Sequence, residues 1–162
     1  MDMDHIIPAA EADRDQIMKL YQEQIGREFC AWDEDYPSDE TIDFDLSRDA
    51  LFIMKENDKV IAAISLEEDE NVEKLRCWNR KLLPSGELAR LAVKPSFQNR
   101  GIARKMMQYA LNDLKRRGCK SVHFLVNRQN IKAIRSYALF GFDVVGECYM
   151  YDQDFLCYEK QL

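Results

Sequence analysis

Hydrophobic residues in the first half of the chain recur with the two spacings that are typical of helices and strands. A helical spacing follows Pro8 and another follows Pro37, where Ser38 is the expected N-cap. Two apolar runs then flank the turn pair Asn57-Asp58, which predicts a hairpin. The expected elements are a short strand at 6–7, a helix over 11–25, a helix from 38, and strands at 51–55 and 59–66. Residues 67–74 and the segment around Trp78 are predicted to be loop or strand edge.

The second half alternates strands with amphipathic helices more clearly. Gly118 and Gly141 are expected to end its two helices. The elements are a strand at 88–93, a helix over 102–117, a strand at 121–126, a helix over 130–140, and a closing hairpin of 144–150 and 154–160 that turns at Asp152-Gln153. A strand, helix, strand order places two strands parallel. We therefore predict an α/β fold with a partly parallel sheet covered by helices.

The length and composition fit a single domain spanning residues 1–162. With 162 residues and 46% hydrophobic content, the chain is long enough to bury roughly two-thirds of its unfolded surface. No apolar stretch approaches the roughly 20 residues that span a membrane, and the start Met1-Asp2-Met3-Asp4 lacks the basic and apolar regions of a signal peptide. We expect a soluble, cytoplasmic protein without a membrane partner.

Charge is divided unevenly along the chain. The net charge is -6, yet residues 1–75 contain 7 Lys and Arg against 22 Asp and Glu, whereas residues 76–162 contain 16 against 7. The basic half suits an anionic ligand, and the acidic half suits long-range attraction of a cationic one. Ordinary solvated surface explains the acidic half equally well.

A candidate anion site connects the strand at 88–93 to the strongly amphipathic helix that follows it. Its sequence is Gln98-Asn99-Arg100-Gly101-Ile102-Ala103-Arg104. A glycine at a helix entrance lets the backbone approach an anion, and the amides and positive dipole end of the helix stabilise its charge. The segment therefore predicts a phosphate-binding loop, although it leaves many nucleotide ligands open.

Other chemically suggestive residues are better interpreted as structural. The five cysteines are odd in number and none forms a CxxC pair, which argues against a disulfide framework and a zinc ribbon. His123 lies between Val122 and Phe124 in a strand with no second histidine nearby, so neither a metal site nor a Ser-His triad is expected. The run Lys115-Arg116-Arg117 fits favourable charge at a helix C-terminus better than a nucleic-acid site. We predict no bound metal and no nucleic-acid partner.

Two sequence motifs lie on either side of the strand at 121–126. The first is Gln98 to Ala103, which follows Leu91-Ala92-Val93. The second consists of Asn130, Ala133, Tyr137 and Gly141-Phe142. They resemble two motifs of the GNAT superfamily of N-acetyltransferases: the phosphate-loop pattern Gln/Arg-x-x-Gly-x-Gly/Ala, and an Asn followed by Ala, Tyr and Gly-Phe. The resemblance covers residues 87–162, while the first 75 residues match only in the order of their elements.

The resemblance implies a GNAT-like fold, in which a central mixed, partly parallel sheet has helices on both faces, and acetyl-CoA as the acetyl donor. The loop at 98–104 would hold the pyrophosphate of coenzyme A through its amides, with Arg100 and Arg104 adding charge. The pantetheine arm would pair with the backbone of the strand at 91–93, where this strand splays from the next one. Asn130 would contact the pantetheine amides or order the loop, and it also fits a helix N-cap. Residues 87–162 would then bind acetyl-CoA and residues 1–86 would form the acceptor side.

Attack of an amine on a thioester requires a base, an oxyanion donor and an acid for the departing thiolate. The resemblance implies Tyr137 as the acid; a tyrosine packed with Ile134 and Ala138 is the alternative. Glu87 is the candidate base because it matches a glutamate used in the histone-acetylating branch, although many members use another residue or a water chain. Its alternative is a solvent-facing strand end. A backbone amide near 91–93 is the expected oxyanion donor.

The sequence does not specify the acceptor amine. Candidates are a polyamine-like or amino-acid-like molecule, a peptide N-terminus and a lysine. Specificity is expected in the first two helices, their connection and the segment around Trp78. The aromatic and acidic residues of the connection are Phe29, Trp32, Asp33, Glu34, Asp35 and Tyr36. A non-catalytic module that binds coenzyme A is the alternative function, and a homodimer would fit the resemblance.

Overall fold

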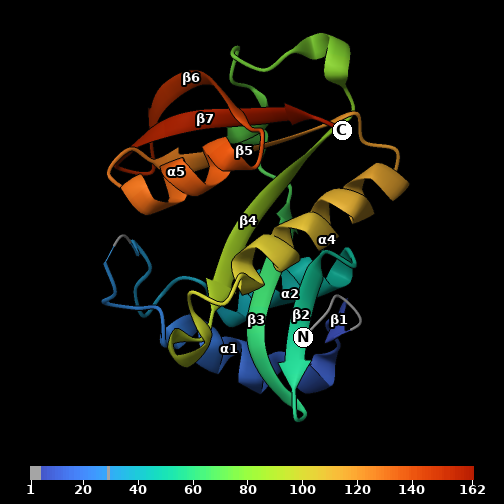
Figure 1. Cartoon of the computed structure of the whole chain (residues 1–162), viewed down its shortest axis with the longest axis vertical. Coiled ribbons are helices and arrows are strands. Elements are labelled where there is room, and N and C mark those ends of the chain that lie inside the picture. The colour runs from blue at the N-terminus through green and yellow to red at the C-terminus, as the bar shows by residue number, and fades with distance from the viewer. Residues whose placement is uncertain (1–4, 29) are drawn as a thin grey trace. The chain divides into compact units, whose positions relative to one another are not determined.

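The computed structural model describes residues 5–28 and 30–162 and contains a mixed sheet with the strand order β1-β2-β3-β4-β5-β7-β6 (Figure 1). The strands are β1 Ile6–Pro8, β2 Leu51–Glu56, β3 Lys59–Glu67, β4 Ser85–Val93, β5 Ser121–Asn127, β6 Asp143–Met150 and β7 Gln153–Gln161. The helices are α1 Arg14–Gln22, α2 Asp39–Ser47, α3 Glu70–Glu73, α4 Ile102–Arg116 and α5 Ile131–Leu139. Strands β4 and β5 pair in parallel, whereas β2–β3, β5–β7 and β6–β7 are antiparallel. The predicted fold class is confirmed.

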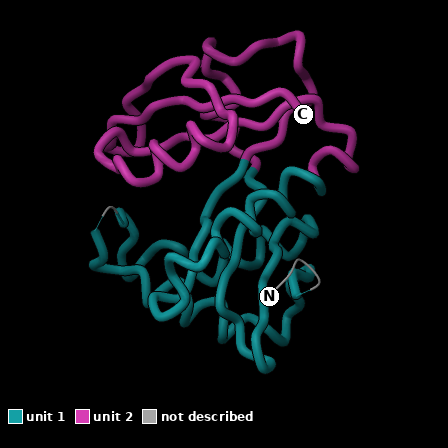
Figure 2. The backbone as a smooth tube through the Cα atoms, in the orientation of Figure 1, with its two compact units in different colours: residues 1–67, 88–113 teal, residues 68–87, 114–162 magenta. Residues whose placement is uncertain are grey.

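The chain divides into two compact units (Figure 2). Unit 1 comprises Met1–Glu67 and Leu88–Asp113, and unit 2 comprises Glu68–Glu87 and Leu114–Leu162. Strand β4 and helix α4 each contribute residues to both units. Each unit therefore combines segments from both halves of the sequence.

Unit 1 is layered, with helices on both faces of β2 and β3 (Figure 1). Alternate residues of a strand point to opposite faces. Leu51 and Ile53 accordingly join the apolar residues of α1 and α2 in one core cluster, whereas the ring of Phe52 contacts Tyr109 of α4 at a centroid distance of 5.2 Å. Full burial of each large apolar side chain stabilises the fold by roughly 1.5–3 kcal/mol.

The first helix is shorter than predicted. A 3-10 turn at Glu11–Asp13 precedes α1, which ends at Gln22. The side chain of Asp13 accepts a hydrogen bond from the Ala10 amide at 2.9 Å and forms an ion pair with Lys55 at 2.8 Å. This buried carboxylate fixes the tight turn where the periodicity predicted regular helix. The predicted start of α2 is confirmed, because the Ser38 hydroxyl accepts the Thr41 amide at 3.3 Å.

Two expectations about connecting segments are wrong. The acidic stretch at 67–74 contains the short helix α3, which is capped by the Asp69 carboxylate accepting the Asn71 amide at 2.9 Å. The closing hairpin turns at Tyr151-Asp152, one residue earlier than predicted, with φ angles of 53° and 59°. Positive φ at both central residues is the turn geometry that matches strand twist. The predicted turn at Asn57-Asp58 has the same geometry, with φ angles of 51° and 63°.

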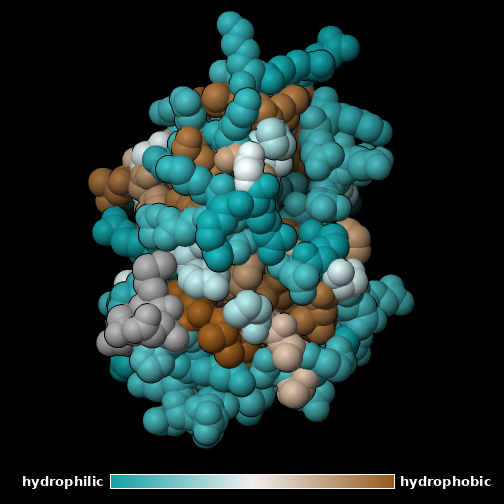
Figure 3. Space-filling view, turned by 90° about the vertical axis from the view of Figure 1, so that its right-hand side faces the viewer, coloured by the Kyte–Doolittle hydropathy of each residue, from teal (hydrophilic) through white to brown (hydrophobic). Residues whose placement is uncertain are grey.

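Hydrophilic side chains cover much of the face shown in Figure 3, and hydrophobic residues are visible between them. Within the described ranges, 5–28 and 30–162, no helix combines the length and the apolar character that crossing a membrane requires.

Candidate active site

The predicted phosphate loop in unit 1 leads directly into α4. Its backbone is left-handed at Asn99 and Gly101, with φ angles of 62° and 76°, and the helix begins at Ile102. A Cβ placed on Gly101 would meet no atom within 4 Å, so the space beside this glycine is open. The first amides of a helix have no acceptor within the helix. The loop therefore presents backbone donors next to open space, as an anion site requires.

Side chains of the loop divide into an exposed set and an anchor. The exposed residues are Asn99, Arg100, Gly101, Ala103 and Arg104. Ile102 is buried and fixes the first turn of α4 to the core of its unit. The Arg100 guanidinium lies 5.0 Å from the centroid of the Phe97 ring. Two guanidinium groups thus stand at the positive end of the helix dipole.

Gln98 contacts the protein with both ends of its side-chain amide. Its Oε1 accepts a hydrogen bond from Arg27 at 2.7 Å, and its Nε2 donates to the Val93 carbonyl at 3.4 Å. Its backbone N–H donates to Pro95 at 3.4 Å. In this structure, Gln98 holds the loop against the end of β4.

The side chains of the strand segment predicted to bind pantetheine pack in or beside the core. Leu91 is half-buried, and Ala92 and Val93 are buried. The Val93 carbonyl already accepts hydrogen bonds from the Gln24 amide at 3.0 Å and from Gln98. The backbone of Leu91 and Ala92 therefore offers better candidate groups for a ligand than the Val93 carbonyl does.

Unit 1 also contains a buried charge network that the sequence analysis missed. The Arg90 side chain is 3% exposed and its Nη2 donates to both oxygens of Asp45 at 2.7 and 2.9 Å. Its Nη1 donates to Glu67 at 2.5 Å and to the Tyr36 hydroxyl at 3.0 Å. The Ser65 hydroxyl donates to Asp45 at 2.8 Å. These partners are 23 to 54 residues from Arg90, so no local pattern in the sequence indicates the network.

The predicted acceptor-side residues have mixed roles. Trp32 packs edge-to-face on Tyr21 with ring centroids 5.4 Å apart, and Tyr36 belongs to the Arg90 network. The Asp33 carboxylate accepts the amides of Asp35 and Tyr36 at 2.8 and 3.1 Å, which shapes the turn between them. Phe29 lies outside the described residues.

Tyr137 lies on α5 in unit 2 within a group of aromatic rings. Its ring centroid is 4.7 Å from that of Phe124, 6.3 Å from that of Phe142 and 5.9 Å from that of Tyr158. Burial, followed by the neighbouring Tyr158, raises the pKa of Tyr137 to about 12. The phenol therefore keeps its proton at neutral pH, which suits a proton or hydrogen-bond donor.

Asn130 immediately precedes α5 and caps it. Its Oδ1 accepts a hydrogen bond from the Ala133 amide at 3.1 Å. The N-cap interpretation of Asn130 is therefore confirmed. Its Nδ2 is a separate group, and contact of that group with a ligand stays a prediction.

Glu87 is the third residue of β4 and lies in unit 2. It is 8% exposed, which excludes a solvent-facing strand end. Its parallel partner on β5 is His123, and its Oε1 lies 3.8 Å from the His123 Nε2. The candidate base is therefore a buried carboxylate beside an imidazole.

His123 has polar and aromatic neighbours that the sequence analysis did not foresee. Its Nδ1 lies 2.6 Å from the Ser85 hydroxyl, and the Trp78 ring lies 4.8 Å from the imidazole. Burial lowers the pKa of His123 to about 4, so the imidazole is neutral at pH 7. Ser85 is 38 residues away along the chain, and only the parallel pairing of β4 with β5 brings it to His123.

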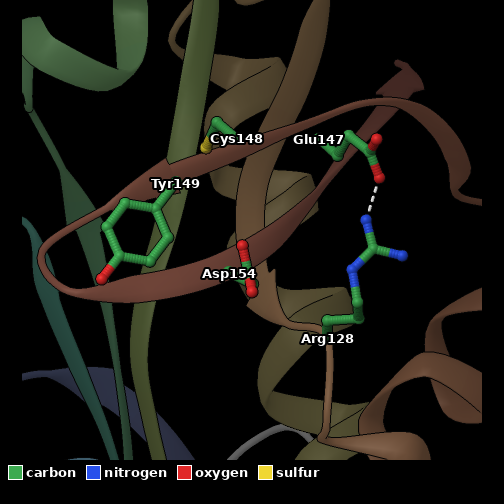
Figure 4. A pocket seen from close by; sticks show the side chains of 5 residues that line it. All are labelled: Arg128, Glu147, Cys148, Tyr149 and Asp154. Atoms are coloured by element: carbon green, nitrogen blue, oxygen red, sulfur yellow. Dashed lines mark hydrogen bonds and ion pairs between the residues drawn. The ribbon is translucent and has the colours of Figure 1, made fainter.

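Two shallow pockets lie away from the predicted residues. One, of about 240 Å³, is in unit 2, where Glu147 on β6 and Arg128 after β5 point toward one another (Figure 4). The other, of about 440 Å³, is in unit 1 beside α1 and the β2–β3 turn. The residues that line them include neither the loop at 98–104 nor Glu87, Asn130 or Tyr137.

Within the part of the chain that the structure describes, no group of three or more His, Cys, Asp or Glu residues is arranged to hold a metal ion. The five cysteines are free thiols. Burial raises the pKa of Cys77 and of Cys157, so these thiols are poorly suited to act as nucleophiles at neutral pH.

The structure places the predicted residues in two sets. Unit 1 contains the strand residues 91–93 and the loop at 98–104, which Gln98 links through its bond to Val93. Unit 2 contains Glu87, Asn130 and Tyr137. The first set contains the predicted donor-binding residues, and the second contains the predicted base and acid together with Asn130.

The mixed sheet of this chain has the fold of known N-acetyltransferases. The chain belongs to the acetyltransferase (GNAT) family, whose sequence profile matches residues 14–142. It is 32% identical over 62 residues to the ribosomal protein bS18-alanine N-acetyltransferase of Salmonella typhimurium. That match covers 38% of this chain and 42% of the relative, less than half of each.

Solved structures show the same fold. The ribosomal-protein-alanine N-acetyltransferase of Brucella melitensis superposes with a TM-score of 0.76 at 20% identity, over 97% of this chain and 99% of that one. The PaiA N-acetyltransferase of Thermoplasma acidophilum, solved in complex with coenzyme A, gives a TM-score of 0.71 at 20% identity, over 97% and 98% of the two chains. Structural neighbours of this chain thus include a protein that binds coenzyme A.

Proposed function

We propose that the chain is an N-acetyltransferase that moves an acetyl group from acetyl-CoA to a primary amine by direct attack. The observation that carries the proposal is the left-handed Gly101 at the entrance of α4, next to open space and within the region matched by the family profile. A pyrophosphate suits the backbone amides of residues 99–104, and Arg100 and Arg104 add positive charge.

Donor binding would use backbone more than side chains. The amides and carbonyls of Leu91 and Ala92 are the proposed partners of pantetheine, because an amide-bearing arm can pair with a strand as a peptide does. Gln98 would act by holding the loop to β4 through its bond to Val93. The Asn130 side chain would use its Nδ2 for the ligand while its Oδ1 caps α5.

The transfer would begin when the amine nitrogen attacks the thioester carbonyl and forms a tetrahedral intermediate. Glu87, directly or through a water, would accept the proton that the nitrogen loses. A backbone amide near residues 91–93 would donate to the oxyanion. Collapse of the intermediate breaks the carbon–sulfur bond and releases coenzyme A as a thiolate.

Tyr137 would assist departure of the thiolate. A thiol has a pKa of about 8.5, whereas burial raises the pKa of Tyr137 to about 12. Complete proton transfer from the phenol to the sulfur is therefore uphill. The phenol contributes most by donating a hydrogen bond to the sulfur as negative charge develops there, and the thiolate then takes its proton from solvent.

The proposed acceptor is the α-amine of a peptide N-terminus. The names of two similar proteins, from Salmonella typhimurium and Brucella melitensis, specify alanine of a ribosomal protein. The acidic N-terminal half, with 22 Asp and Glu in residues 1–75, would attract a protonated amine by long-range steering. An unprotonated fraction of that amine then reacts.

Calorimetric titration with acetyl-CoA, followed by a coenzyme A release assay, tests the function. The acceptor panel contains an alanine-initiated peptide, a lysine peptide with a blocked N-terminus, and spermidine. We expect saturable binding of acetyl-CoA and release of coenzyme A with the alanine-initiated peptide. Binding without release for any amine would indicate a coenzyme A-binding module, and absence of binding would contradict the proposal altogether.

A further inference from the structure

Unit 2 contains a small buried cluster built around the His123 imidazole. Three neighbours of the ring are defined: the Ser85 hydroxyl 2.6 Å from Nδ1, the Glu87 Oε1 3.8 Å from Nε2, and the Trp78 ring at 4.8 Å. His123 is 3% exposed. An imidazole held in this way has one orientation, and that orientation aims Nε2 at the candidate base.

The strand register explains why these side chains meet. Glu87 is opposite His123 in the parallel β4–β5 pair, and His123 is opposite Glu159 in the antiparallel β5–β7 pair. Directly opposed residues point to the same face of a sheet. All three are buried, at 8%, 3% and 6% exposure. Three ionisable side chains thus form a row across three adjacent strands.

Glu159, at the end of this row, binds a different part of the chain. Its carboxylate oxygens accept the Asn79 amide at 3.1 and 3.2 Å. The indole N–H of the preceding residue, Trp78, donates to the Val72 carbonyl at 2.7 Å. Glu159 and Val72 therefore fix the Trp78 ring against His123, and Glu87 is the carboxylate that faces Nε2.

The hydrogen-bonding capacity of a neutral imidazole limits the possible arrangements. One ring nitrogen carries the proton and the other accepts. If the Ser85 hydroxyl donates to Nδ1, the proton lies on Nε2 and faces the Glu87 carboxylate. If Nδ1 carries the proton and Glu87 is ionised, an unprotonated nitrogen and an unprotonated oxygen lie 3.8 Å apart in a buried site, which is unfavourable.

We propose that His123 is a positioning residue for Glu87: Ser85 fixes its Nε2–H tautomer, and this N–H holds the Glu87 carboxylate ionised and oriented toward the acceptor amine. The inference rests on the proposed function, because Glu87 is the base only if the chain transfers acetyl groups. At 3.8 Å the interaction is electrostatic, and catalytic contacts are often longer in the unliganded protein than in the reacting complex.

The same three residue types occur in hydrolytic triads, where serine is the nucleophile. Here Ser85 contacts Nδ1 and the carboxylate faces Nε2, the reverse of the triad order. Ser85 is therefore assigned to orient the ring. Replacing Ser85 with alanine should then reduce kcat only several-fold, and complete loss of activity in S85A would overturn the assignment.

Two substitutions of His123 distinguish a role in orienting Glu87 from a role in packing alone. The amide of glutamine reaches the position of Nε2, and that of asparagine reaches the position of Nδ1. We expect H123Q to keep most of kcat and H123N to lose about ten-fold, with the KM for acetyl-CoA unchanged in both. A merely structural role would favour H123N, which retains the contact with Ser85, and equal activity of the two variants would overturn the proposal.

The pH profile of kcat supplies a readout that packing alone would not move. H123N lacks the N–H that faces the Glu87 carboxylate, so the acidic limb of its kcat–pH profile should move to higher pH. The profile of H123Q should keep the acidic limb of the wild type. Other ionisable groups near this row are Glu159 on β7, Cys77, which interacts with Glu159, and Tyr151 in the β6–β7 turn, whose hydroxyl donates to Asp69. An E159Q control should leave the limb in place, and a limb that follows Glu159 would contradict the assignment.

Nitrogen NMR of labelled His123 tests the tautomer directly. At pH 7 we expect a proton on Nε2 and none on Nδ1, and the reverse pattern would overturn the proposal. Failure of the proposed function can be distinguished from failure of the proposed role of His123. A wild-type protein that transfers no acetyl group refutes the proposed function. Normal transfer by the wild type together with unchanged H123N kinetics refutes only the role of His123.

Discussion

Tyr137 and Glu87 lie beside different kinds of neighbour. Tyr137 packs among aromatic rings, and burial raises its pKa to about 12, so it stays protonated. Glu87 is buried beside an imidazole whose pKa burial lowers to about 4, so this imidazole is neutral at pH 7. The proposed proton donor is therefore packed among aromatic rings, whereas the proposed base lies beside a neutral polar ring.

Replacing Tyr137 with phenylalanine should lower kcat by about 10- to 100-fold, because the sulfur loses its hydrogen-bond donor as charge develops. The Kd for acetyl-CoA should change less than about two-fold. Tyr109 is a matched control, since it also packs against a ring, that of Phe52. Unchanged turnover in Y137F, or an equal loss in Y109F, would remove Tyr137 from the donor role.

The buried imidazole also predicts how stability depends on pH. The folded-state pKa of His123, about 4, lies below the ordinary value of 6.5, so between these values the unfolded chain binds more protons than the folded one. Stability should therefore fall as the pH falls from about 6.5 to 4, by up to about 3 kcal/mol from this residue. Urea unfolding of wild type and H123Q at pH 7 and pH 4.5 measures this contribution. An equal loss in both proteins would contradict it.

The start and the end of α4 depend on glycines with similar backbone but different surroundings. Gly101 has a φ of 76° at the entrance, and Gly118 has a φ of 91° beyond the C-terminus. At that end, the Gly118 amide donates to Lys115 and the Cys119 amide to Leu114, both at 3.0 Å, which is a Schellman cap. Neither glycine has an atom within 4 Å of a Cβ placed on it. The two positions are therefore well matched for comparison.

Substitution of Gly101 with valine should weaken acetyl-CoA binding by at least about ten-fold, since the side chain enters the open space beside the loop and strains a left-handed backbone. Gly118→Val should lower the free energy of unfolding by about as much as Gly101→Val, about 1–2 kcal/mol. It should leave the affinity for acetyl-CoA unchanged. Calorimetry and thermal unfolding of both variants distinguish the two effects. Normal affinity in G101V would refute the phosphate loop.

The Arg90 network stabilises the connection between α2 and the sheet of unit 1. Arg90 has a left-handed backbone, with a φ of 50°, which is unfavourable for this residue type and is held by its bonds to Asp45, Glu67 and Tyr36. We expect Asp45→Ala to lower the free energy of unfolding by about 3–5 kcal/mol, because a buried guanidinium loses its bidentate partner.

Asp43→Ala on the same helix is the control for this substitution. Asp43 forms an exposed ion pair with Arg14, and its loss should cost no more than about 1 kcal/mol. Denaturant unfolding of both variants gives the comparison. Similar losses of stability would show that the network contributes no more than a surface ion pair.

Elements with strong local signals were predictable from the sequence. The turn at Asn57-Asp58, the cap at Ser38 and the amphipathic α4 were all located correctly, because turn residues, capping residues and periodicity act over a few positions. The predicted position of the last turn differs by one residue from the observed turn at Tyr151-Asp152. Tyrosine is not a typical turn residue, and the register of the two strands determines where the turn lies.

The candidate site also contains features that local sequence predicts and features that depend on distant contacts. The loop at 98–104 follows from a local motif. The Ser85–His123 contact and the Arg90–Asp45 pair join residues 38 and 45 positions apart, and only strand pairing and helix packing create them. Local pattern therefore indicates only an ordinary strand residue at His123 and gives no sign of the Arg90 network.

For the molecule as a whole, the two compact units each combine segments from both halves of the sequence. The proposed donor loop is in unit 1, and the proposed proton donor and base are in unit 2. Organisation as one functional domain and assembly as a homodimer both stay predictions.

Transfer of an isotope-labelled acetyl group from acetyl-CoA to an alanine-initiated peptide, read by mass spectrometry, tests this account most directly. We predict that the wild-type protein places the label on the peptide α-amine, that G101V at the same donor concentration places little, and that G118V behaves as wild type. Bound acetyl-CoA with no labelled peptide, or equal labelling by G101V, would contradict the proposal that the Gly101 loop binds the acetyl donor of an N-acetyltransferase.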